Sequence, residues 1–104
     1  PAYFDGPAAR ARLGNSYALK PLYSREGANV TLVASGEVVD SDGGAYGKEG
    51  FVVQALARMT RFDDRYPVIG SWVVGEDACG IGLREDVSPI TKNTSRFIPH
   101  AILP

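Results

Sequence analysis

The strongest constraint on the fold is a series of short apolar runs, each of β-strand length and each closed by a turn. Residues 30–34 and 37–40 flank Ser35-Gly36, an arrangement that predicts a hairpin. Residues 67–75 and 78–84 flank Glu76-Asp77 and predict a second hairpin. Because no helical crossover separates these runs, the sequence excludes an independent doubly wound α/β domain.

The other segments predict one helix and further strands. These segments are a short helix at residues 7–13, strands at 17–22 and 51–56, a glycine-rich loop at 41–50 and a last extended segment at 97–103. Pro7 suits the first helical turn and Gly14 suits the helix end. The loop is expected to be mobile and to pack against no core. The predicted fold class is therefore α+β, a mostly antiparallel sheet with one short N-terminal helix.

Size and charge narrow the class of protein. The 104 residues suffice for a single domain or a fragment, and the formal net charge of -1 gives no electrostatic case for binding nucleic acid or an anionic membrane. Cys79 is the sole cysteine, which excludes an intrachain disulfide and a cysteine zinc cluster and fits a cytoplasmic location. Cys79 and Trp72 are interpreted as buried apolar side chains. A packed or capping role is expected for His100, the only histidine.

The segment from Lys20 to Asn29 predicts phosphate binding. Lys20 ends an apolar β run, Pro21 stops regular pairing, and a polar loop with Gly27 leads into the next strand. A lysine supplies a compact positive charge, and a glycine lets backbone N–H groups approach an anion closely. The alternative is a solvated lysine at a strand edge and a glycine that serves a turn.

Several blocks along the chain resemble the glutathionylspermidine synthase family, an ATP-grasp group of amide-forming ligases. In chain order, these blocks are Lys20-Pro21 with Arg25-Glu26-Gly27-Ala28-Asn29, Val53-Gln54-Ala55-Leu56, Ile69-Gly70-Ser71-Trp72, Gly80-Ile81-Gly82-Leu83-Arg84-Glu85, Ile90-Thr91-Lys92-Asn93-Thr94-Ser95-Arg96-Phe97 and Pro99-His100. The blocks look like the C-terminal, ATP-binding part of the family, and the chain is then expected to form part of an ATP-grasp fold.

The resemblance implies an ATP-driven reaction. A carboxylate is activated as an acyl phosphate, and an amine then attacks it to give an amide, ADP and phosphate. By this resemblance, Lys20, Arg25 and Gly27 contact the nucleotide phosphates, and a cation offsets the charge that develops during phosphoryl transfer. The alternative for Arg25 is an ion pair with Glu26 or another nearby carboxylate.

Two further segments acquire roles by the same resemblance. The four residues that would border adenine are Gln54, Ala55, Leu56 and Ala57. Adenine recognition needs a backbone donor and a backbone acceptor beside an apolar wall, and the alternative is an ordinary core strand. Arg84 is the predicted catalytic residue, which holds a phosphate or a substrate carboxylate. Its alternative is an ion pair with Glu85 or Asp86.

Cofactors and partners follow from the family. The resemblance implies ATP and magnesium, with the magnesium ligands outside this chain, so no metal site is assigned. Because the family's ligases are several times longer, a fragment or remnant is expected, with no catalysis and weak ATP affinity alone. Partners in the parent ligase are a nucleotide, an acid and an amine. The alternative function is a standalone, non-catalytic β module that mediates protein association, with homo-oligomers formed through exposed sheet edges.

Overall fold

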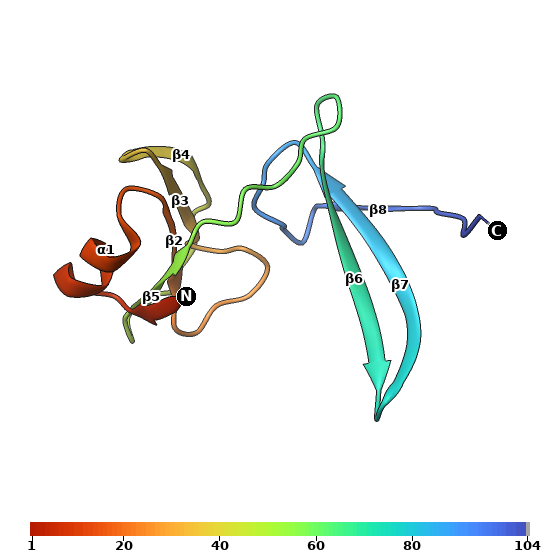
Figure 1. The fold of residues 1–104 in the computed structure, drawn as a ribbon, viewed down its shortest axis with the longest axis horizontal. Coiled ribbons are helices and arrows are strands. Elements are labelled where there is room, and N and C mark those ends of the chain that lie inside the picture. The colour runs from red at the N-terminus through yellow and green to blue at the C-terminus, as the bar shows by residue number, and fades with distance from the viewer. Residues whose placement is uncertain (104) are drawn as a thin grey trace. The chain divides into compact units, whose positions relative to one another are not determined.

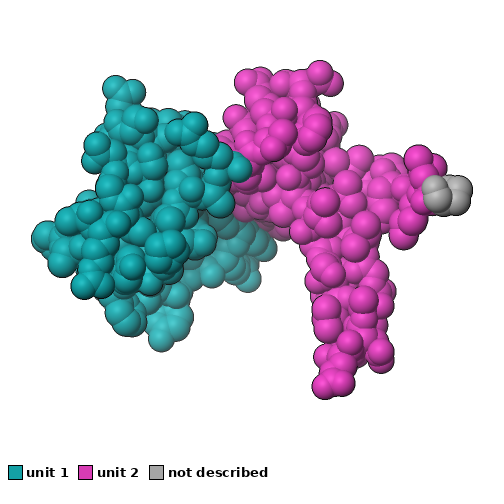
Figure 2. All heavy atoms as spheres, viewed as in Figure 1, with its two compact units in different colours: residues 1–58 teal, residues 59–104 magenta. Residues whose placement is uncertain are grey.

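The computed structural model describes residues 1–103, and the chain divides into two compact units. The first unit spans Pro1–Arg58 and the second begins at Met59, as coloured in Figure 2. Each unit has its own sheet, where the sequence predicted one domain or fragment. Both sheets are antiparallel and the described chain has one short helix, which confirms the α+β class.

The first unit contains a five-stranded sheet with the order β1-β5-β2-β3-β4 (Figure 1). Its strands are β1 (Ala2–Phe4), β2 (Tyr17–Pro21), β3 (Thr31–Ala34), β4 (Glu37–Ser41) and β5 (Phe51–Ala55). The predicted hairpin is confirmed as β3 and β4, with Ser35 and Gly36 in left-handed conformations at the turn. Strand β1 was not predicted, because three residues form a strand only through their pairing with the distant β5.

The core of this unit is small and centres on β5. Val53 is fully buried, with 0% of its surface exposed, and Ala18 and Val33 lie nearby in β2 and β3 with 6% and 7% exposed. Helix α1 (Pro7–Leu13) confirms the predicted range and contacts β5. It begins with Pro7 in its first turn and ends at Gly14, whose φ of 70° favours glycine.

An ion pair fixes the start of this helix to the strand before it. Arg10 donates to both carboxylate oxygens of Asp5, from Nε and from Nη2, each at 2.7 Å. The hydrogen bond from Arg10 lowers the pKa of Asp5 from its usual value. The Arg10 guanidinium also lies 5.8 Å from the ring centroid of Tyr17 in β2. These contacts hold α1 beside the sheet.

The second unit contains a three-stranded sheet of β6 (Tyr66–Val74), β7 (Asp77–Asp86) and β8 (Arg96–Ile98). The predicted hairpin is confirmed as β6 and β7, although its turn falls at Gly75 and Glu76, where Gly75 has a φ of 64°. Strand β8 pairs with β7 only from Leu83 to Glu85, so the far half of the hairpin extends beyond it (Figure 1).

Two expectations about this hairpin are wrong. Trp72 is 69% exposed rather than part of a core, and Cys79 is exposed rather than buried. An apolar sequence predicts the strand, but only a covering layer buries its side chains, and the far half of this sheet has no such layer within its own unit. Among residues 1–103, no helix has the length and apolar character needed to cross a membrane.

Candidate functional site

Lys20 lies in β2 and contacts a second predicted binding residue. Its Nζ donates a hydrogen bond to Oε1 of Gln54 in β5 at 2.9 Å, although 34 positions separate the two residues in the sequence. The register explains this contact, since Lys20 pairs with Val52, and Gln54 projects from the same face two residues further along β5. This hydrogen bond therefore links Lys20, which is predicted to contact phosphate, with Gln54, the first residue of the segment predicted to border adenine.

The charge of Lys20 has no carboxylate partner within residues 1–103. Its bonded partner, the amide oxygen of Gln54, is neutral. An ammonium with no carboxylate beside it attracts anions. The hydrogen bond itself is exposed to solvent, so the alternative of a solvated lysine is also compatible with the structure.

Two loops leave the same end of the sheet, next to Lys20. The first loop covers residues 22–30 and joins β2 to β3, and the second loop covers residues 42–50 and joins β4 to β5. The cross-strand pairs Pro21–Phe51 and Thr31–Ser41 place these four strand termini at the same end of the sheet. Leu22 N–H also donates to the carbonyl of Gly50 at 2.9 Å, which links the two loops at their base.

The first loop contains a tight turn, closed by the Ala28 N–H, which donates to the carbonyl of Arg25 at 3.0 Å. Glu26 and Gly27 are both left-handed, with φ values of 57° and 77°. Ser24 Oγ donates to the carbonyl of Ala28 at 2.6 Å and holds the loop closed. In the described part of the chain, the backbone N–H groups of Glu26 and Gly27 have no acceptor. Backbone N–H groups without an acceptor are available to donate to an anion.

Arg25 lies on this loop with an exposed side chain. Within residues 1–103 it forms no ion pair, neither with Glu26 nor with another carboxylate. The alternative of an internal ion pair therefore has no support in the structure. The contact of Arg25 with a phosphate stays a prediction.

The segment from Gln54 to Ala57 is less open than the adenine role requires. Strand β5 pairs with β1 on one side and with β2 on the other. Ala55 N–H donates to the carbonyl of Pro1 at 2.9 Å, and Leu56 N–H donates to the carbonyl of Ser16 at 3.4 Å. Of the four predicted residues, only Ala57 keeps an N–H without an acceptor in the described structure. Donation from a backbone N–H to a base is thus confined to the end of this segment.

Arg84 belongs to the second unit and organises a loop there. Its Nη2 donates to the carbonyls of Lys92 and Ser95, the latter at 3.2 Å, and its guanidinium lies 5.1 Å from the ring centroid of Phe97. Its Nε is buried and has no hydrogen-bond partner. A structural role for Arg84 is therefore visible, and its predicted catalytic role is a separate, open prediction.

The carboxylates beside Arg84 are engaged elsewhere. Glu85 forms an ion pair with Arg96, and Asp86 accepts a hydrogen bond from Ser95 Oγ at 2.7 Å. This bond from Ser95 is the main cause that lowers the pKa of Asp86, so the folded chain favours the ionised carboxylate. The alternative of an ion pair between Arg84 and either neighbour is therefore not what the structure contains.

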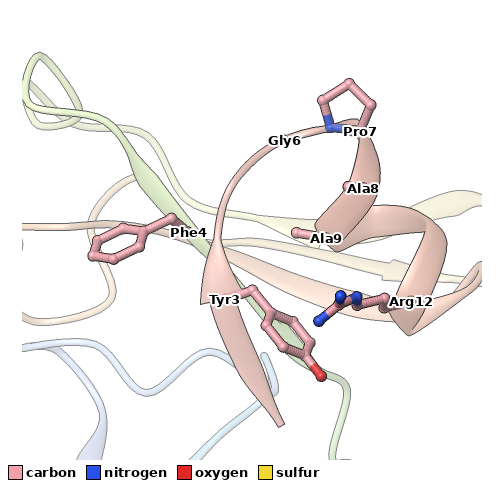
Figure 3. A pocket seen from close by; sticks show the side chains of 7 residues that line it. All are labelled: Tyr3, Phe4, Gly6, Pro7, Ala8, Ala9 and Arg12. Atoms are coloured by element: carbon pink, nitrogen blue, oxygen red, sulfur yellow. The ribbon is translucent and has the colours of Figure 1, made fainter.

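A shallow hollow of about 290 Å³ lies between β1 and α1. Tyr3, Phe4, Pro7, Ala8, Ala9 and Arg12 line it. Figure 3 shows Arg12 turned toward the ring of Tyr3, and the two groups lie 5.6 Å apart. The polar side chains of its lining are the phenol of Tyr3 and the guanidinium of Arg12. In residues 1–103 no cluster of three metal-binding side chains exists.

Comparison with known proteins decides the family. A family model described as glutathionylspermidine synthase preATP-grasp matches residues 1–103. The chain belongs to the glutathionylspermidine synthase family. That description names the preATP-grasp part of the family and not the C-terminal part, so the predicted position within the ligase is wrong. The short blocks identified the family, but local strand and turn patterns do not encode a position within a longer fold.

Three relatives illustrate the match to the glutathionylspermidine synthase family. The chain is 43% identical to a candidate acid–amine ligase of Haemophilus influenzae, covering 100% of this chain and 28% of the relative. It is 42% identical to a trypanothione synthetase of Crithidia fasciculata, covering 78% of this chain and 13% of the relative. It is 32% identical to the bifunctional glutathionylspermidine synthetase/amidase of Escherichia coli, covering 80% of this chain and 14% of the relative. The chain thus spans less than a third of each relative's length.

Asn29 makes a contact between the two loops that the sequence did not predict. Its φ of 56° is left-handed, and its side-chain Oδ1 accepts a hydrogen bond from the N–H of Tyr46 in the second loop, at 2.9 Å. Hydrogen bonds therefore link the second loop to the first, although most residues of the second loop are exposed. The adjacent glycines Gly43 and Gly44 were a signal for a close approach of two backbones, but they do not name the partner.

Proposed function

We propose that the chain supplies phosphate contacts in the ATP-binding portion of a glutathionylspermidine synthase-like carbon–nitrogen ligase. The observation that carries this proposal is the Lys20 ammonium, which lies beside Gln54 at the sheet end where the first loop begins and has no carboxylate partner among residues 1–103. Lys20, Arg25 and the free N–H groups of Glu26 and Gly27 are the donors in this site. A triphosphate is the kind of anion that such a set recognises.

The chemistry assigned to the whole ligase is amide formation through an acyl phosphate. The names of the relatives, which include an acid–amine ligase and a glutathionylspermidine synthetase, support this reaction class. Arg84, with its partnerless Nε, is the residue we assign to a phosphate or substrate carboxylate. We assign magnesium, the acid and the amine to other parts of the ligase and place the protein in the cytoplasm.

The isolated chain is expected to bind ATP weakly and to be inactive. Lys20 and Arg25 face the charge of a triphosphate without a metal cluster among the described residues. Titration of the ¹⁵N-labelled chain with Mg-ATP should shift the amides of Lys20 and of residues 24–29. Lys20→Ala removes the uncompensated cation and should lower the affinity about tenfold, a loss of about 1.4 kcal/mol.

The matched control for Lys20→Ala is Arg61→Ala, which removes the same charge from an exposed position in the other unit. This control should bind ATP like the native chain. Equal affinity for all three proteins, or shifts that avoid the first loop, would count against the phosphate role of Lys20.

A second candidate function is protein association through β6. This strand forms the edge of its sheet, contains no charged residue, and exposes 67% of Ile69, 69% of Trp72 and 62% of Val73. An uncharged, exposed edge strand favours pairing with another strand. If a second copy pairs there, sedimentation velocity should show a concentration-dependent dimer that Val73→Lys abolishes. Val38→Lys, at an equally exposed site on β4, is the control. A monomer at all concentrations would contradict this function.

A further inference from the structure

Asn29 joins the first and second loops at two points. Its backbone N–H donates to the carbonyl of Gly43 at 3.3 Å, and its side-chain Oδ1 accepts from the N–H of Tyr46 at 2.9 Å. At the next residue of the first loop, the carbonyl of Val30 accepts a hydrogen bond from the N–H of Asp42 at 2.9 Å. Three hydrogen bonds therefore cross between the loops around this one residue.

The loops also fit together closely at Gly44. A Cβ added there would lie 2.5 Å from Oδ1 of Asn29 and 3.1 Å from Cβ of Ala28. A Cβ added at the neighbouring Gly43 would meet nothing within 4 Å. Residue 44 must therefore be glycine for the Asn29 side chain to reach the second loop, whereas residue 43 carries no such requirement.

The side chain of Asn29 is not needed to close the first loop. That loop closes on itself, since Val30 N–H donates to the carbonyl of Gly27 at 3.1 Å and Ala28 N–H donates to the carbonyl of Arg25 at 3.0 Å. The φ of 56° at residue 29 could also be adopted by glycine. The amide side chain therefore has a separate task, which is to hold the glycine-rich second loop.

We propose that Asn29 is a positioning residue that holds the two loops together as one wall of the phosphate site. This inference rests on the proposed function, because it assigns the wall to the triphosphate of a nucleotide. Without the Asn29 side chain, the second loop moves independently, and the first loop loses the neighbour that limits its motion. Binding the phosphates then requires both loops to be ordered, which lowers the affinity.

The test uses the whole ¹⁵N-labelled chain, with Mg-ATP and inorganic tripolyphosphate as probes. In Asn29→Gly, which retains the backbone conformation, and in Gly44→Ala, the Tyr46 amide should exchange faster before any ligand is added. The initial slope of the first-loop shifts against ligand concentration should fall about tenfold for both probes. Gly43→Ala is the matched control and should behave like the native chain.

A double-mutant cycle separates a shared contact from two unrelated losses. If Asn29 and Gly44 act through the same contact, the double variant Asn29→Gly with Gly44→Ala should bind no more weakly than the weaker single variant. The shifts of β2 and β5 should stay native in all variants, which shows that the sheet is intact. Additive losses, or native affinity in Asn29→Gly, would overturn the proposal.

The outcomes also distinguish this inference from the proposed function. Weak binding in Lys20→Ala with native binding in Asn29→Gly upholds the phosphate site and overturns the positioning role. Weak binding in Asn29→Gly with native binding in Lys20→Ala upholds the positioning role and overturns the role of Lys20. Identical spectra of the native chain with and without both probes overturn both.

Discussion

Replacing Val53 with aspartate should unfold the first unit. Val53 is 0% exposed at the centre of β5, between Tyr3 of β1 and Leu19 of β2. A carboxylate at this fully buried position loses its contact with water, at a cost of several kcal/mol. A unit of this size with so few buried side chains has only about 5 kcal/mol of stability to lose. The ¹⁵N spectrum should lose its dispersed resonances for residues 2–55.

Two variants calibrate this result. Val53→Ala removes two buried methyl groups without adding charge and should cost about 2 kcal/mol, measured by urea denaturation. Val38→Asp adds the same charge on β4 at a side chain that is 64% exposed, and it should leave the fold intact. A native spectrum for Val53→Asp would mean that the core of this unit does not centre on β5.

Replacing Arg84 with alanine should release the loop between β7 and β8. The guanidinium bonds the carbonyls of Lys92 and Ser95 and stacks on Phe97, so alanine leaves these carbonyls without that donor and removes the ring contact. Hydrogen bonds that involve a charged group contribute about 1.5–3 kcal/mol each. Amides of residues 88–95 should exchange at least tenfold faster, as measured by hydrogen–deuterium exchange.

The controls for Arg84 separate charge from geometry. Arg96→Ala removes an exposed arginine whose ion pair with Glu85 lies on the same sheet, and it should cost less than about 1 kcal/mol. Arg84→Lys keeps the charge but not the planar guanidinium, so it should recover only part of the lost protection. If Arg84→Ala and Arg96→Ala alter exchange equally, the loop does not depend on Arg84.

Because Arg84 also holds the loop between β7 and β8, a loss of ligase activity in an Arg84 variant has two explanations. An inactive Arg84→Ala ligase would fit either a lost oxyanion contact or a disordered loop. The hydrogen bonds of Arg84 to the loop carbonyls use Nη2, so other N–H groups of the guanidinium remain for an oxyanion, although Nε itself is buried. A ligase variant that keeps loop protection but loses activity would therefore assign the loss to the contact itself.

The sequence predicted those elements that depend on neighbouring residues. The helix at 7–13, the hairpin across Ser35-Gly36 and the hairpin of β6 and β7 were all predicted, because caps, turn residues and apolar runs act over a few positions. The blocks of the resemblance likewise identified the family.

Contacts between distant segments were decided only by the tertiary structure. The pairing of β1 with β5, the bond from Lys20 to Gln54 and the bond from the Tyr46 amide to Asn29 join residues that no local pattern relates. Exposure of Trp72 and Cys79 was decided in the same way, because an apolar run specifies a strand and not whether another layer covers it. The physical reason is that local backbone preferences are encoded within each segment, whereas burial and long-range hydrogen bonds depend on which segments the fold brings together.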